Sequence, residues 1–441
     1  MPHRGKKSGK PRSKKYELNS DPEGDRYDTI QLGSILKKLT IQEQALISQK
    51  SKKVVKSLLQ LWQNDYKHLE LGKLQWQLRG ENMHCFLNHM REHFQSVVFR
   101  SEQLQEELNI LEQAGVEELP QVTSCQIAPS NQVNREKNRN FVQWPFHALP
   151  KLLINLRSLE TLTPIQSSFI DQFKKLKDLK IHEGISNAAL KAIMESGLPL
   201  RKLHFLSKRL HILEGISNLS HLKDLMVNLN TFQNRRDEII RLPNLLDLQI
   251  HETIDPEETL EAIKFVIDRN SSAMKSFKLN TGFMVNSENL KKMKLSRCSA
   301  LNEIILVHCQ FDNRDLDMLS LPDSPVLAVF FDCPDLTDLQ LLDFYKSCPN
   351  LHEIVLGWCP LLTEEVLHNI LKVRREGNYK NSFLIKVTDC PTLSNSYKDN
   401  EIYWAQKASY LKLELLNEDF ALENMLHFQL HNCNPKSRTA A

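Results

Sequence analysis

Glycine is scarce in this 441-residue sequence, and long apolar runs are missing. The 13 glycines argue against the glycine-rich loops that bind phosphates and dinucleotides. No segment approaches the ~18 consecutive apolar residues of a membrane-spanning helix, and the N-terminus does not resemble a signal peptide. We therefore expect an intracellular protein without a membrane segment, in the cytoplasm, the nucleus or both.

The motifs of common enzymes are also missing. The sequence has no Gly-x-Ser-x-Gly, no His-Glu-x-x-His, no phosphate-binding loop and no dinucleotide fingerprint. Histidines recur at repeat-equivalent positions at His182, His204 and His251, and we interpret them as solvated surface side chains rather than metal ligands. We expect a non-enzymatic protein with no catalytic residues, no metal and no cofactor.

Positive charge is concentrated at one end of the chain. The formal net charge is +3, but residues 1–15 contain seven Lys or Arg and no acid, which leaves −4 for the remainder. We predict a disordered basic tail over residues 1–26 and a disordered tail over 434–441. The basic tail fits a nuclear localisation signal, a nonspecific contact with an anionic surface, or a segment without function. The acidic body makes nucleic acid an unlikely partner.

The nine cysteines form no Cys-x-x-Cys pair. Most recur one repeat apart, which favours buried structural thiols over disulfide partners or metal ligands. These cysteines are Cys298, Cys309, Cys333, Cys348, Cys359, Cys390 and Cys433.

One apolar pattern recurs ten times between Leu176 and Cys433. Its clearest copy has apolar residues at Leu351, Ile354 and Leu356, followed by Cys359. The alternation fits a short strand with inward apolar side chains, and segments such as 335–345 have the period of a covering helix. The central residues of the ten units are Leu179, Leu203, Leu225, Leu248, Phe277, Ile304, Ala328, Ile354, Ile385 and Phe428.

A unit that recurs every 20 to 30 residues or so is the signature of a leucine-rich-repeat solenoid. We therefore predict an α/β horseshoe over residues 73–433. Weaker early units centre on Val97, Val122 and Leu159, with a loop inserted at residues 130–140. Residues 401–424 are expected to form a longer closing segment.

The segment 27–72 has a different pattern, that of three short helices. The first carries Leu32, Ile35, Leu36 and Leu39; Thr40 to Glu43 is a capping box that opens the second. The third places Trp62 on its apolar face. A unit of this size buries too little surface to be robust alone.

Two resemblances suggest a function. The segments Cys333 to Thr337 and Cys359 to Thr363 resemble the cysteine-containing class of leucine-rich repeats, and the three helices before the repeats resemble an F-box. The resemblance implies a substrate-recognition adaptor of a cullin–RING (SCF-type) ubiquitin ligase, which binds the small adaptor and the cullin scaffold and presents a protein target for degradation. The residues implied in adaptor binding are Leu32, Ile35, Leu36, Leu39, Ile41, Leu46 and Ile47.

Two alternatives stay open. The helices could be a plain cap on the first repeat, and the chain a leucine-rich-repeat scaffold or regulator unrelated to ubiquitin. A cap should have a polar outer face, whereas an F-box should leave Leu32, Leu36 and Ile47 partly uncovered.

The target is expected on the concave face of the later repeats. Outward positions there turn apolar, and we predict a target-binding patch. Its predicted residues are Ile305, Val307, Val329, Phe331, Val355 and Trp358. Coverage by residues 401–441, or a register shift that exchanges Phe330 with Phe331, would remove this patch.

Overall fold

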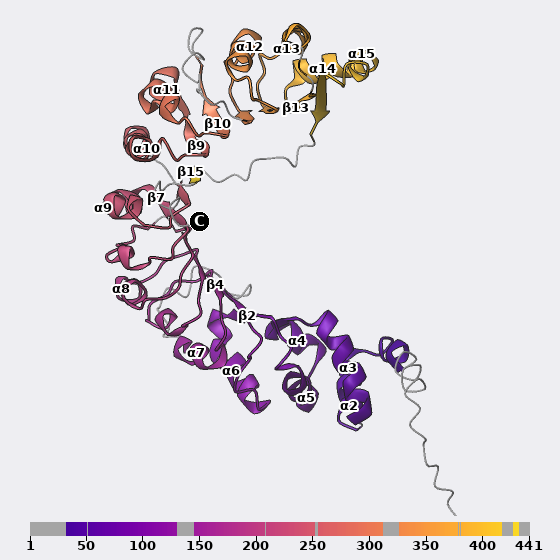
Figure 1. The fold of residues 1–441 in the computed structure, drawn as a ribbon. Coiled ribbons are helices and arrows are strands. Elements are labelled where there is room, and N and C mark those ends of the chain that lie inside the picture. Colours follow the sequence, from indigo (N-terminus) through magenta and orange to yellow (C-terminus); the bar gives the residue numbers. More distant parts are fainter. Residues whose placement is uncertain are drawn as a thin grey trace, which may run out of the picture.

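The sheet of the protein follows an arc. The computed structural model describes residues 32–50, 52–129, 145–207, 209–251, 255–311, 326–377, 379, 381–416 and 427–431. Within them, fifteen strands form one sheet in the order β1 to β8, β15, then β9 to β14. The strands line the inside of the arc and the helices its outside (Figure 1). This is the architecture of the predicted α/β leucine-rich-repeat horseshoe.

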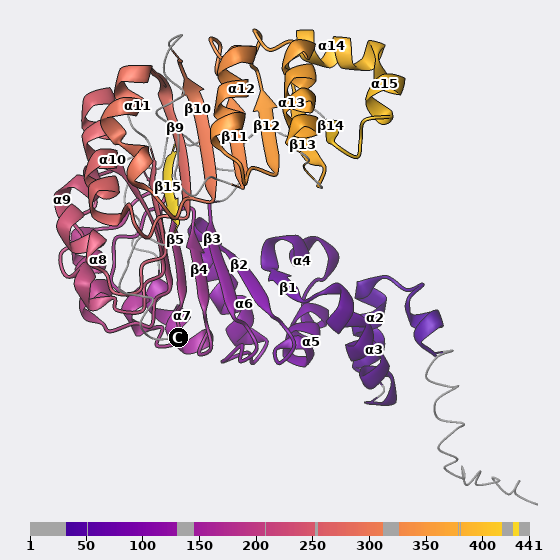
Figure 2. The same cartoon turned by 45° about the horizontal axis from the view of Figure 1, so that its top comes forward.

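Successive repeats contribute one strand each, and Figure 2 shows these strands side by side. The strands are β1 (His68–Glu70), β2 (Ser96–Arg100), β3 (Ser124–Ala128), β4 (Ser158–Thr161), β5 (Asp178–Ile181), β6 (Lys202–Phe205), β7 (Asp224–Asn228), β8 (Asp247–His251), β9 (Ser276–Val285), β10 (Glu303–Cys309), β11 (Leu327–Phe331), β12 (Glu353–Gly357), β13 (Phe383–Thr388), β14 (Leu411–Leu415) and β15 (His427–His431).

The helices vary in length along the arc. They are α2 (Ile41–Ser48), α3 (Lys52–Asp65), α4 (Leu71–Gln77), α5 (Glu81–Met90), α6 (Leu104–Gln113), α7 (Leu149–Leu152), α8 (Asn187–Glu195), α9 (Leu229–Ile240), α10 (Pro256–Asn270), α11 (Ser287–Met293), α12 (Asp338–Ser347), α13 (Glu364–Glu376), α14 (Pro391–Asp399) and α15 (Glu401–Ala405). No helix within the described ranges is long and apolar enough to cross a membrane.

The predicted central residues pair with one another from strand to strand. Leu179 lies opposite Leu203, and Ile354 lies opposite both Ala328 and Ile385. All nine central residues from Leu179 to Ile385 are fully buried. Burial of one such side chain contributes about 1.5–3 kcal/mol, so the stack of equivalent positions forms the core. The first nine predicted units are therefore confirmed.

The helices begin where a side chain caps them. Thr337 accepts a hydrogen bond from the backbone N–H of Gln340, whose side chain accepts one from the Thr337 N–H. This capping box starts α12 at Asp338 rather than at the predicted Asp335. Thr363 caps α13 after the next cysteine turn by accepting a hydrogen bond from the Glu365 backbone N–H.

Two strands differ from the predicted units. The residue of β3 opposite Val97 is Cys125, not Val122, because residues 119–122 form the turn before the strand. Strand β14 lies in the predicted closing segment and was not predicted, although Tyr410, Leu413 and Leu415 repeat the apolar spacing of the other units. Leu413 lies opposite Ile385, so β14 extends the parallel sheet by one repeat. The predicted inserted loop at 130–140 lies outside the described residues.

The tenth predicted unit does not stack as a further parallel repeat. Its strand β15 lies antiparallel between β8 and β9, with Phe428 opposite Ile250 and Leu279. Every other neighbouring pair in the described sheet is parallel. The chain therefore returns to the middle of its own sheet.

The N-terminal helices join the first repeat through a shared core. Gln44 donates to the carbonyls of Leu36 and Leu39 and accepts from the Trp62 indole at 2.7 Å. The Trp62 ring meets Phe86 of α5 edge-on at 4.9 Å. The predicted capping box at Thr40 and Glu43 is present. The sheet begins at His68, inside the segment assigned to the helical unit.

A buried carboxyl group lies under the first strands. Glu107 of α6 is 2% exposed, and its carboxylate accepts the Arg100 backbone N–H at 2.9 Å. Burial raises the pKa of Glu107 to about 7, against the lowering effects of this hydrogen bond and of the Arg100 charge. The folded chain thus holds this proton more tightly than the unfolded chain does.

We predict that Glu107 makes folding less favourable as pH rises. Its contribution is complete below pH 4.5 and is lost as pH passes through about 7. Glu107→Gln should remove this dependence, so the variant gains up to about 3 kcal/mol relative to wild type between pH 4.5 and pH 8. Urea unfolding at several pH values measures the difference. Glu106→Gln, at an exposed neighbour, is the control; identical pH profiles for wild type and Glu107→Gln would contradict the prediction.

Candidate functional site

The concave face of β10 to β13 carries two rows of side chains. In-register pairing places Ile305, Val329, Val355 and Lys386 in one row. The second row contains Val307, Phe331, Gly357 and Thr388. Five of the six predicted target-binding residues thus lie together in these rows.

The patch is less exposed than the sequence predicted. Val307, Val329, Phe331 and Val355 are buried, and Ile305 is half-buried. Strands in a sheet are about 4.8 Å apart, so equivalent branched and aromatic side chains cover one another. Only Trp358, at 51% exposure, projects from the set.

The face of Phe331 is the predicted one. Phe330 is fully buried and meets Phe344 of the covering helix α12 edge-on at 5.2 Å. Phe331, on the opposite side of the strand, lies against Trp358 with ring centroids 5.3 Å apart. The register shift considered from the sequence does not occur.

Gly357 makes room for this aromatic pair. A Cβ at position 357 would lie 2.3 Å from both Cδ2 and Cε2 of Phe331. The Phe331 ring therefore lies over strand β12 at Gly357, which has no side chain, and in this position it contacts Trp358.

One residue at the carboxyl end of each of these four strands, within β10 and directly after β11, β12 and β13, has an unusual backbone conformation. His308, Asp332, Trp358 and Asp389 have φ between 49° and 58°, a left-handed conformation that costs most residues about 1–2 kcal/mol. We call these four residues the left-handed ridge. Backbone hydrogen bonds from Asp332 N to Gly357 O, and from Trp358 N to Thr388 O, continue the ladder through the ridge.

Each ridge residue precedes a buried cysteine. The thiols of Cys309, Cys333, Cys359 and Cys390 lie 3.2–3.6 Å from the carbonyl oxygen two residues earlier. Burial raises the pKa of Cys298 to about 12 and that of Cys348 to about 11, so these groups stay protonated. The prediction of structural thiols is confirmed for the described positions; Cys433 lies outside them.

Ion pairs order the polar part of this face. His308 Nδ1 lies 2.6 Å from Asp332 Oδ2 at one end of the ridge. Lys386 pairs with Glu353 at 2.6 Å within the rows. Of the charged ridge side chains, Asp389 has no ion-pair partner among the described residues.

Two histidines of the earlier repeats, expected at the solvated surface, belong to polar contacts between strands. His204 and His251 are buried, not solvated. His204 lies 2.8 Å from Asp224, which also pairs with Lys202, and His251 contacts the Phe205 carbonyl. Burial opposes ionisation of Asp224, but the hydrogen bonds from His204 and Lys202 outweigh it and lower its pKa. These contacts order adjacent strands.

The predicted adaptor-binding residues divide into buried and exposed sets. Leu36 (2% exposed) and Ile41 are buried, so the expectation of a partly uncovered Leu36 is wrong. The Leu36 side chain belongs to the hydrophobic core that continues into the first repeat. Ile35 (58%) and Leu46 (45%) are exposed. The remaining three are half-buried: Leu32, Leu39 and Ile47.

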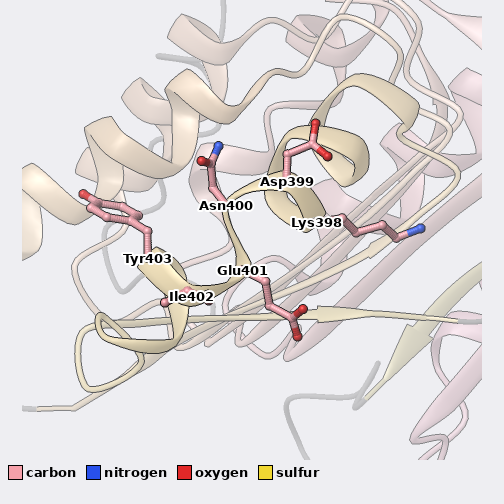
Figure 3. Close-up of a pocket in the computed structure, with 6 residues that line it drawn as sticks. All are labelled: Lys398, Asp399, Asn400, Glu401, Ile402 and Tyr403. Atoms are coloured by element: carbon pink, nitrogen blue, oxygen red, sulfur yellow. The ribbon is translucent and has the colours of Figure 1, made fainter.

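Residues for a metal ion are not assembled in the described part of the chain. No three His, Cys, Asp or Glu side chains there converge on a metal position. A pocket of about 340 Å³ lies where α14 meets α15 (Figure 3). All its lining residues belong to 398–403. The pocket is therefore a crevice between two consecutive helices. Asn400 and Trp404 donate hydrogen bonds to the Glu364 carboxylate and so hold this turn against α13.

Two solved structures are similar to parts of this chain. An internalin from Listeria monocytogenes is 14% identical with a TM-score of 0.34, over 63% of this chain and 70% of that one. A leucine-rich-repeat protein from Leptospira interrogans is 11% identical with a TM-score of 0.34, over 66% and 89%. No protein-family profile and no curated protein matches the sequence.

We predict that Gly357→Ala displaces the Phe331 ring. The new methyl group would overlap the ring, so the variant should lose about 1–3 kcal/mol of stability and alter the fluorescence of Trp358. Thermal unfolding and emission spectra measure both effects, and the spectral change should vanish in a Trp358→Phe background. Gly33→Ala, where a Cβ meets no atom within 4 Å, is the matched control. Wild-type stability together with an unchanged spectrum would contradict the proposed role of Gly357.

Proposed function

We propose that the chain is a substrate-recognition subunit of a cullin–RING (SCF-type) ubiquitin ligase. In this proposal the N-terminal helices bind the small adaptor that joins the cullin, and the repeats bind a protein target. Other subunits carry out the covalent transfer, so the chain needs no nucleophile. It would act in the cytoplasm, the nucleus or both; the basic residues 1–15 lie outside the described part.

The observation that carries the proposal is the outer surface of the N-terminal unit. Ile35 and Leu46 remain 58% and 45% exposed although the same helices bury Leu36 and Ala45. Large apolar side chains left uncovered on a short helical unit are typical of a surface that another protein covers. Together with the F-box resemblance, they support adaptor binding.

The position of the target surface also supports this division of roles. The strands β10 to β13 lie near the other end of the arc from α2 and α3 (Figure 1). A protein held at the ridge would therefore leave the N-terminal helices free for an adaptor. The half-exposed Trp358 beside Phe331 is the kind of aromatic anchor on which binding energy concentrates.

A second candidate function is that of a repeat scaffold unrelated to ubiquitin, with the helices as a cap. The shared core favours it: Trp62 lies against Phe86, and Gln44 links all three helices. Terminal repeats of a solenoid need such covering. The two candidates differ in whether the exposed apolar side chains have a partner.

We predict that Ile35→Asp with Leu46→Asp abolishes capture of the adaptor and the cullin. A charge in an apolar contact is costly, whereas at these exposed positions it should leave the fold intact. Affinity purification of the tagged full chain, scored for both ligase subunits, measures capture, and thermal unfolding checks the fold.

The matched control is Ile402→Asp, at a residue 80% exposed near the other end of the arc; it should retain both subunits. If the folded wild-type chain recovers neither adaptor nor cullin, the ubiquitin-ligase proposal is wrong and the scaffold function stands. Unchanged capture by the double variant would show that these helices are not the adaptor site.

A further inference from the structure

The left-handed ridge carries charged and aromatic side chains at positions where glycine would have the least backbone strain. Five non-glycine residues in the described part have a positive φ, and four of them form this ridge. Glycine adopts the conformation without the clash of a Cβ. Backbone strain that persists in successive repeats motivates a functional explanation for the side chains placed there.

The ridge places Trp358 between two aspartates. Phe331, Gly357 and Thr388 are paired in register, and the residues that follow them are Asp332, Trp358 and Asp389. Neighbouring strands are about 4.8 Å apart, so Asp332 and Asp389 are the neighbours of Trp358 along the ridge; the Asp332 carboxylate bonds to His308 on the far side. Phe331 contacts the indole from within the concave face, while half of the Trp358 surface stays open.

One carboxylate of the ridge has no cationic partner. Asp332 is held by His308 at 2.6 Å. Asp389 accepts a hydrogen bond from the Thr388 hydroxyl and has no ion-pair partner among the described residues. The lysine of the neighbouring row, Lys386, is engaged by Glu353. The ridge therefore combines an aromatic face with an unpaired carboxylate at Asp389.

We propose that the ridge receives a lysine or arginine side chain from the protein partner, with the cation against Trp358 and beside Asp389. A cation over an indole is attracted by the ring quadrupole, and the unpaired carboxylate of Asp389 adds a charge-assisted hydrogen bond. This inference deepens the proposed target binding and rests on it. It states the chemistry of the recognised residue: a basic side chain in an exposed segment of the partner.

The left-handed backbone makes a clean test available. Glycine at a ridge position removes the side chain and relieves the backbone strain, which offsets part of the stability lost with the side-chain contacts; thermal unfolding checks the fold of each variant. The variants are Trp358→Gly and Asp389→Gly. The matched control is Lys294→Gly, which has the same φ region at 54° but lies off the ridge.

The probe is a displayed library of random peptides, selected against the full-length chain. We expect the selected peptides to be enriched in lysine or arginine at one position. A selected synthetic peptide should bind the two ridge variants about tenfold or more weakly and the Lys294→Gly chain unchanged, while all three variants still unfold cooperatively well above the assay temperature. Acetylation of a lysine in that peptide should cause a similar loss.

Three outcomes would overturn the inference: selection of no peptide, selection without enrichment of basic residues, or undiminished binding to Trp358→Gly. None of these depends on the N-terminal helices. Adaptor capture with a failed ridge test would leave the ligase proposal intact, and peptide recognition without adaptor capture would leave the ridge intact on a scaffold protein.

Discussion

The arc depends on contact between equivalent apolar residues of successive strands. No single repeat buries its own apolar face, so each strand is stable only while its central residue packs against those of its neighbours. The pairing of Leu179 with Leu203, or of Ile354 with Ile385, fixes the register of the whole strand. With the register fixed, every other position along the strand is assigned to the core or to the concave face.

The turn after each late strand connects this core to the surface. The buried cysteine must point back toward the carbonyl two residues earlier, and the residue before it takes a left-handed conformation. Consequently the side chains of Asp332 and Trp358 are fixed in direction by the same packing that stabilises the repeat. A surface built in this way loses little conformational freedom when a partner binds.

The sequence predicted the repeats well because their signal is periodic. Nine central residues were identified from spacing alone, and all nine are buried. The predictions failed where contacts with residues distant in the chain determine whether a side chain is buried. Leu36, which an F-box was expected to leave partly uncovered, is buried, and His204 was expected in water but is held by Asp224. The aromatic pair of Phe331 and Trp358 needs the missing Cβ of Gly357 on another strand. The spacing of apolar residues does not encode the positive φ of Asp332 or the antiparallel orientation of β15, so neither could be predicted from it.

Strand β15 also changes how the solenoid folds. A repeat array with contacts only between neighbours gains structure stepwise as each unit is added. Here β8 and β9 are separated by a strand that the ribosome makes after all the other strands described. The two halves of the sheet therefore acquire their final connection last, through pairing between residues far apart in sequence. Such long-range pairing is slow, because its loop must close before any hydrogen bond forms. The middle of the arc, rather than either end, is thus the last part of this sheet to be completed.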